Sequence, residues 1–150
     1  NKNLKKFTIL RLGTYIPKNI ILCINKKSFI GIFLNNLKKN LIEFDFDSTV
    51  EKDFLFSGRF ITVLRNIIRS KLIGTYNVSS GKSIVVNDII NLLNSKKSLK
   101  VIIKKNKVNE SFILENYKVN KKLKINYKHT SFQNEFDEFI KNLIKIINSS

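Results

Sequence analysis

Residues 74–93 constrain the fold of this chain more than any other segment. They begin with the strand-like run Thr75-Tyr76-Asn77-Val78 and continue through a turn at Gly81 and a β-branched run at 84–86. Apolar residues at helical spacing follow, at Ile89, Ile90, Leu92 and Leu93. A buried strand, a turn, a second extended piece and an amphipathic helix in so short a segment predict an α/β fold.

The motif Ser80-Gly81-Lys82-Ser83 looks like the end of a phosphate-binding P-loop, but its surroundings exclude that function. A P-loop needs a glycine five residues before Gly81, where this chain has Tyr76. It also needs a helix that begins directly after the motif, so that its amides point at the phosphates, whereas β-branched residues follow here. We therefore interpret Gly81 as a turn glycine.

Apolar periodicity predicts the other elements of the chain. Strands are expected at 7–12, 42–46, 52–56 and 99–103, and helices in the second half of 19–40 and at 60–71, 89–93, 118–123 and 132–147. Gly74 is expected to terminate the helix before it. Thr130 and Gln133 fit a capping box at the start of the last helix.

The composition is that of a globular protein in a reducing compartment. The 150 residues suit one domain, and no apolar run approaches the roughly 18 residues of a membrane span. The only cysteine, Cys23, excludes an internal disulfide and is expected to be a small core side chain. We predict a cytoplasmic protein without a membrane partner. Because the chain contains no Met, we expect it to be either a fragment or a natural remnant of a longer protein.

The net charge of +17 raises the alternative of a nucleic-acid-binding domain. Nearly all of the cations are lysines spread along the chain, whereas readers of bases and phosphates favour the arginine fork. We interpret the charge as a solvated surface and expect no nucleic-acid partner, with a basic nucleic-acid-binding domain kept as an alternative.

No catalytic or metal-binding constellation stands out. Tyr117 and Lys121 have the Tyr-x-x-x-Lys spacing of short-chain dehydrogenases, but so short a match is expected by chance in a lysine-rich chain. His129 has no Cys nearby, and the glycines are too dispersed for a dinucleotide-binding fingerprint. We predict no catalytic, cofactor-binding or metal-binding residue in this chain.

Five segments, in order, are similar to the C-terminal half of the extended short-chain dehydrogenase/reductases, the NAD-dependent sugar-nucleotide epimerase/dehydratase family. FTILRL at 7–12 resembles TILRLFNVYGP, and KDFLF at 52–56 resembles RDFIYV. Residues 74–93 resemble GTYNVGSGKSISVNELIELI, residues 112–123 resemble SYVLDNSKAKKLL, and TSFQNEF at 130–136 resembles TSLEEGL.

The resemblance implies an α/β fold: the C-terminal part of an extended Rossmann-type fold, with the last parallel strands of its sheet and a small mixed α/β substrate-binding subdomain. Strands 7–12 and 75–78 should then share a parallel sheet, with helix 60–68 packed against it. Residues 1–150 would form one domain. The half that binds NAD(P) and carries the catalytic Tyr and Lys would be absent, so this chain alone would bind no cofactor and be inactive.

The resemblance also implies site residues and partners. Lys52 falls where the family has a diphosphate-binding Arg, and Lys105, with Lys107 as its alternative, falls near a second family Arg. The implied partner is a UDP-, dTDP- or GDP-linked sugar used in surface glycan synthesis, and the intact enzyme is expected to form a homodimer. The sugar and the reaction type stay open.

Two departures from the family favour an alternative function. The loop at 13–17 is shorter and lacks the family's Asn, and Ser57-Gly58-Arg59 replaces the usual VDD. A degenerate, non-catalytic member that serves as a binding or assembly module is therefore the second hypothesis.

Overall fold

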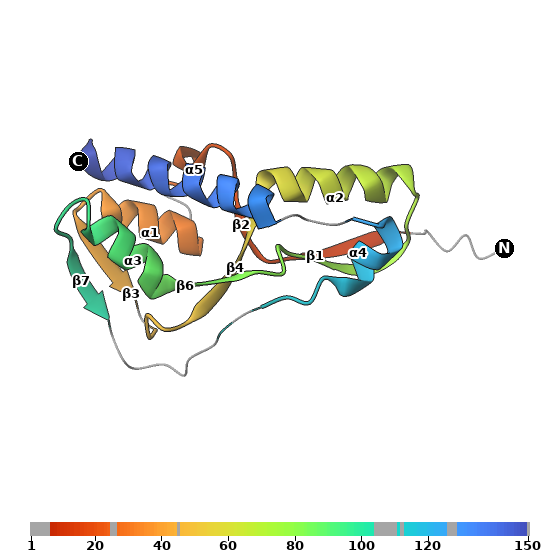
Figure 1. Cartoon of the computed structure of the whole chain (residues 1–150), viewed down its shortest axis with the longest axis horizontal. Helices are drawn as coiled ribbons and strands as arrows, with labels where there is room; N and C mark the ends of the chain where they lie inside the picture. Colours follow the sequence, from red (N-terminus) through yellow and green to blue (C-terminus); the bar gives the residue numbers. More distant parts are fainter. Residues whose placement is uncertain are drawn as a thin grey trace.

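The fold is described from a computed structural model that covers residues 7–24, 27–44, 46–103, 111, 113–125 and 129–149, without the side chains of His129 and Thr130. Figure 1 shows the elements in chain order: β1 (Thr8–Leu12), β2 (Thr14–Ile16), the 3₁₀ helix η1 (Ile20–Cys23), α1 (Phe29–Leu37), β3 (Leu41–Phe44), β4 (Glu51–Phe56), α2 (Ser57–Arg69), β5 (Gly74–Val78), β6 (Ser83–Val85), α3 (Val86–Asn94), β7 (Lys100–Ile103), α4 (Tyr117–Leu123) and α5 (His129–Asn148). The predicted strands and helices are confirmed, with boundaries shifted by a few residues. Residues 14–16, which were expected to lie in a loop, form β2 instead and pair with β4.

Parallel strand pairs form most of the sheet structure. β1 pairs with β5, with Leu10 opposite Tyr76, and β3 pairs with β7, with Phe44 opposite Ile103. The third sheet is mixed, because β4 pairs with β2 in parallel and with β6 in antiparallel orientation. The α/β class and the shared parallel sheet of β1 and β5 are confirmed.

The apolar interior has two clusters. The smaller cluster packs α2 and α4 on the β1–β5 pair through Leu55, Val63, Ile67, Tyr76, Val78 and Val119. This confirms the predicted packing of α2. The larger cluster joins α1, α3 and α5 to β3 and β4, and Figure 1 shows α5 running along α1 and α3. Among the described residues, no helix has both the length and the apolar character needed to cross a membrane.

The end of α2 differs from the prediction that Gly74 terminates this helix. Lys71 adopts the left-handed conformation with φ of 47°, and Leu72 N donates to Ile67 O at 3.2 Å, which closes the helix as in a Schellman motif. Gly74, with φ of 120°, opens β5 instead, and its N–H donates to Phe7 O. Gly74 therefore bends the chain into the sheet, where a side chain would be strained.

The start of α5 also differs from the prediction. The helix begins at His129, so Thr130 lies inside its first turn and is not the residue that precedes it. Gln133 Nε2 donates to Asp137 Oδ1 at 2.8 Å, a contact between residues four apart on one helix face. The predicted capping box is therefore wrong, because the helix starts earlier than its pattern indicated.

Glu135 of α5 supplies the missing cap of α2. Phe56 precedes α2 and offers no capping side chain, while Glu135 Oε1 accepts a hydrogen bond from Gly58 N at 3.0 Å. A carboxylate at a helix N-terminus satisfies an unpaired amide and complements the helix dipole. This hydrogen bond links α5 to the start of α2.

We expect Glu135→Ala to lower the free energy of unfolding by about 0.5–2 kcal/mol, the usual cost of losing an N-terminal cap. Glu138→Ala is the matched control, because Glu138 is an exposed carboxylate one turn away on α5 that makes no hydrogen bond to α2 within the described residues. Urea denaturation followed by circular dichroism measures the free energy of unfolding of both variants. Equal midpoints for the two variants would contradict a capping role for Glu135.

Candidate functional site

Lys52 lines a cavity that α1, the end of β3 and β4 enclose together. The cavity has a volume of about 560 Å³, within the range of small-molecule sites. Its lining residues are Phe29, Ile32, Asn36, Glu43, Phe44, Phe46 and Lys52. Among the described lining residues, one cation, one carboxylate and one amide therefore face the space beside four apolar side chains.

Nearly parallel phenyl rings form one wall of this cavity. The Phe29 ring stacks on Phe44 at 5.9 Å between centroids with an interplanar angle of 11°, and the Phe44 and Phe46 centroids are 4.8 Å apart. Phe33, behind them, stacks on Phe29 at 6.1 Å. Such a wall presents flat apolar faces, which can stack against another planar ring.

The side chain of Lys52 lies over this aromatic wall. Its Nζ is 5.0 Å from the centroid of the Phe46 ring, a cation–π contact. Because successive strand residues point to opposite sides, Lys52 faces the cavity while its neighbour Asp53 faces the interior. The cavity thus has a half-buried positive charge at the edge of its apolar wall.

Asp53 anchors the turn that holds the partner strand of Lys52. This carboxylate is fully buried, and its Oδ1 accepts hydrogen bonds from Ser80 N at 2.9 Å and Ser80 Oγ at 2.8 Å. The turn leads into β6, whose Ile84 lies opposite Lys52. The buried face of β4 therefore helps to fix the backbone from which Lys52 projects.

Arg59 belongs to a buried polar network outside the cavity. Its Nη2 donates to Asn120 Oδ1, and Asn120 Nδ2 donates to Asn116 Oδ1 at 2.7 Å. Asn116 Nδ2 in turn donates to Ser79 O at 3.1 Å. The network joins α2 and α4 to the turn after β5. Arg59, which departs from the family sequence, therefore serves packing in this chain.

The predicted site residues have different outcomes. Lys52 lies in the cavity wall. Lys105 and its alternative Lys107 lie outside the described residues. Ile103 is the last described residue before them, and it pairs with Phe44 of the cavity wall. That Lys52 and Lys105 contact a diphosphate stays a prediction.

Tyr117 and Lys121 are not arranged as a catalytic pair. Tyr117 is 60% exposed, and Lys121 Nζ lies over its ring, 5.5 Å from the centroid, and not beside a buried phenol. Within the described part of the chain, His, Cys, Asp and Glu form no group that could hold a metal ion. The side chain of His129 lies outside that part. Cys23 packs partly buried against the larger apolar cluster.

Sequence reasoning missed the aromatic wall. Phe29, Phe44 and Phe46 were expected only as apolar positions of a helix and a strand. Phe46 lies beyond the end of β3, where its ring meets Lys52. The high density of Phe before Lys52 was the only signal, and it does not separate a cavity wall from a core.

Neither a protein-family model nor a curated protein matches this chain. Solved structures do. An NAD-dependent NDP-hexosamine 5,6-dehydratase of tunicamycin biosynthesis matches with a TM-score of 0.71 and 18% identity over 95% of this chain and 46% of that chain. A UDP-N-acetylglucosamine 4-epimerase from Methanobrevibacter ruminantium matches with 0.69 and 16% over 93% of this chain and 46% of that one.

A third similar structure is the UDP-glucose 4-epimerase from Thermotoga maritima, with a TM-score of 0.64 and 17% identity over 96% of this chain and 46% of that chain. This chain therefore spans about half the length of the structures it resembles. At such identities the likeness shows the fold, and it confirms the predicted resemblance to one half of these proteins.

Proposed function

We propose that this chain, whose fold is that of the C-terminal part of NAD-dependent sugar-nucleotide epimerases and dehydratases, is the substrate-side portion of such an enzyme. Its ligand would be a UDP-, dTDP- or GDP-linked sugar. The observation that supports this most is Lys52, which combines the position of the family's diphosphate-binding Arg with a cavity walled by aromatic rings. The reaction, its use in surface glycan synthesis and a cytoplasmic location belong to the same proposal.

The cavity offers chemistry suited to each part of a nucleoside diphosphate. Lys52 supplies a cation for a phosphate group, as a point charge without the bidentate fork of Arg. The partly exposed Phe29 and Phe46 rings offer apolar surface for a planar base, and Asn36 and Glu43 offer hydrogen-bonding groups at the same cavity. We include Lys105 as a second phosphate contact on the strength of the family resemblance.

NAD(P) would be held outside this chain. The Gly81 turn leads into β6 before α3 begins, so helix amides do not follow the glycine directly as in a dinucleotide-binding turn. When bound in an intact enzyme, the cofactor would supply hydride transfer. The residues of this chain would bind and orient the nucleotide part of the substrate.

The open edge of β1 supports a larger sheet. Among the described strands, β1 pairs with β5 alone. Gly74 N donates to Phe7 O and Gly13 N donates to Val78 O. The backbone groups of the alternate residues, Thr8, Leu10 and Leu12, therefore face away from β5. Parallel sheets are usually buried and wider than two strands, so this edge is suited to another strand.

The proposal predicts that UDP binds saturably and more tightly than uridine, because only UDP has a diphosphate for Lys52. Lys52→Ala should weaken UDP binding about tenfold, the equivalent of one charge-assisted hydrogen bond, and should leave uridine binding nearly unchanged. Lys96→Ala is the control, since Lys96 is an exposed lysine after α3. Isothermal titration calorimetry at physiological salt measures the binding of UDP and of uridine to the unchanged chain and to both variants.

Other outcomes would favour the alternatives. Absence of saturable UDP binding, or equal losses for Lys52→Ala and Lys96→Ala, would contradict the proposal. Binding to DNA or RNA with a steep salt dependence would favour a basic nucleic-acid-binding domain. UDP-sugar binding with no turnover by the longest natural protein that contains this chain would favour a non-catalytic binding module, which the altered segment around Arg59 also favours.

A further inference from the structure

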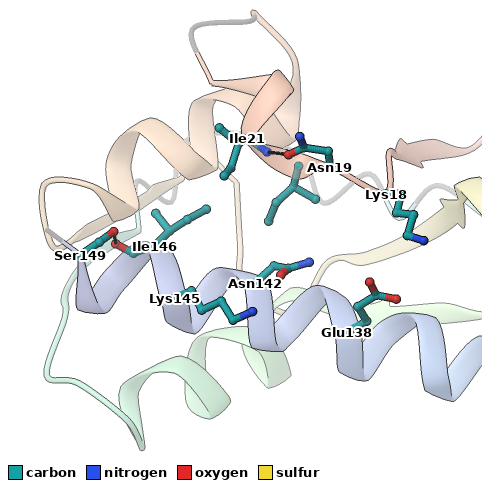
Figure 2. A pocket seen from close by; sticks show the side chains of 9 residues that line it. Lys18, Asn19, Ile21, Glu138, Asn142, Lys145, Ile146 and Ser149 are labelled. Carbon is teal, nitrogen blue, oxygen red and sulfur yellow. Dashed lines mark hydrogen bonds between the residues drawn. The ribbon is translucent and has the colours of Figure 1, made fainter.

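A second cavity lies between η1 and the C-terminal half of α5, and it shares no lining residue with the Lys52 cavity (Figure 2). Its volume is about 640 Å³, again within the range of small-molecule sites. The lining residues are Lys18, Asn19, Ile20, Ile21, Glu138, Asn142, Lys145, Ile146 and Ser149. Nothing in the proposed function uses this cavity.

Isoleucine side chains make the cavity apolar inside. Ile20 and Ile146 are 3% and 7% exposed and form part of the larger apolar cluster, whereas Ile21 is 60% exposed at the cavity. An apolar group placed among these three side chains would remove a large exposed isoleucine from water. None of the described lining residues is aromatic, so the cavity suits an aliphatic or bulky apolar body better than a stacked base.

Asn142 and Lys145 supply two polar groups to the cavity. They are three residues apart on α5, and both line the cavity (Figure 2). Within the described part of the chain, neither side chain makes a hydrogen bond or an ion pair. An amide and an ammonium beside an apolar space can together bind an acidic group.

The other described charged groups at this cavity are Lys18 and Glu138. Their charges are opposite, so they offset each other in the net charge of the described lining. The Ser149 hydroxyl already donates to Ile146 O at 2.9 Å, and Asn19 Oδ1 accepts from Ile21 N at 3.2 Å. Lys145 therefore leaves the cavity with a net positive charge near Asn142.

We propose that this second cavity binds a small monoanionic amphiphile. The apolar body of the ligand would lie against Ile20, Ile21 and Ile146, and its acid group, a carboxylate or sulfonate, would contact Lys145 and Asn142. The ligand differs in chemistry from a nucleotide-sugar, which carries several charges and a polar sugar. The site is thus independent of the Lys52 cavity.

The test uses 8-anilinonaphthalene-1-sulfonate, whose fluorescence rises when its apolar rings leave water, titrated into the whole chain. Saturable binding with one site is expected, and Lys145→Gln should weaken it about tenfold through the loss of one charge-assisted contact. Lys141→Gln is the matched control, because Lys141 is an exposed lysine of α5 that does not line the cavity. Thermal melts establish that both variants are folded.

A neutral analogue and a competitor complete the experiment. N-phenyl-1-naphthylamine has the same rings without the sulfonate, so it should bind more weakly and respond little to Lys145→Gln. Glu138→Gln should tighten binding of the sulfonate by about two- to threefold, because it removes a nearby negative charge. UDP should not displace the probe. Equal responses of Lys145→Gln and Lys141→Gln, non-saturable fluorescence, or equal affinities for the two probes would overturn the proposal.

Discussion

Replacing Phe54 with alanine is expected to lower the free energy of unfolding by about 3–5 kcal/mol, the range for removing a buried phenyl ring. Phe54 is fully buried in the middle of β4. Its ring lies 6.2 Å from Phe29 of α1, 6.5 Å from Phe56 of β4 and 5.9 Å from Phe139 of α5. Alanine would leave a cavity where two helices meet the mixed sheet, and neighbours held by three elements cannot collapse to fill it.

Urea denaturation followed by circular dichroism measures this loss. Leu22→Ala is the control, because Leu22 is 68% exposed on η1 and a surface substitution changes stability by no more than about 0.5 kcal/mol. A loss for Phe54→Ala as small as that of the control would contradict the packing described for β4. A variant too unstable to purify would have to be compared through Phe54→Leu, which should lose roughly half as much.

Replacing Gly81 with alanine is expected to destabilise the chain by about 2–3 kcal/mol, through two separate effects. Gly81 has φ of 70°, and a side chain in this left-handed conformation costs roughly 1–2 kcal/mol. A Cβ at this position would also lie 2.8 Å from Asn116 Nδ2. Asn116 would have to move, and its hydrogen bond to Ser79 O would be lost, at about 1 kcal/mol.

A double-mutant cycle separates these two effects. In an Asn116→Ala background the side chain that blocks the Cβ is gone, so Gly81→Ala should then cost only the conformational part. The coupling between the two positions is expected to be about 1 kcal/mol. Urea denaturation of the four proteins gives the cycle. If the two losses in the free energy of unfolding were strictly additive, the Asn116 side chain would not be what a Cβ at position 81 clashes with.

Local sequence patterns were sufficient for most of the elements. The run that forms β5, the turn at Gly81 and the short strand before α3 appear in the structure as their residue types predicted. Helix ends were less predictable. Gly74 and Thr130 were assigned to helix ends, but Lys71 closes α2 and α5 begins before Thr130. Helix ends depend on a few hydrogen bonds, for which neighbouring residues compete.

The candidate site could be predicted only in part. Lys52 came from a resemblance to a family motif, and nothing in the apolar pattern distinguished it from other lysines. The aromatic wall beside it requires α1 to pack on β3, which brings Phe29 against Phe44. Lys105 remains a prediction, because it lies outside the described residues.

The sequence by itself determined the α/β class and the order of most strands and helices, because propensity, turn chemistry and apolar period act over a few neighbouring residues. It did not predict β2 or η1. The parallel pairing of β1 with β5 followed from the resemblance to a known fold. Only the tertiary structure decided what surrounds Lys52 and which side chains line the space between η1 and α5. A cavity is made by residues from distant segments, and its shape and charge depend on contacts that no local pattern encodes.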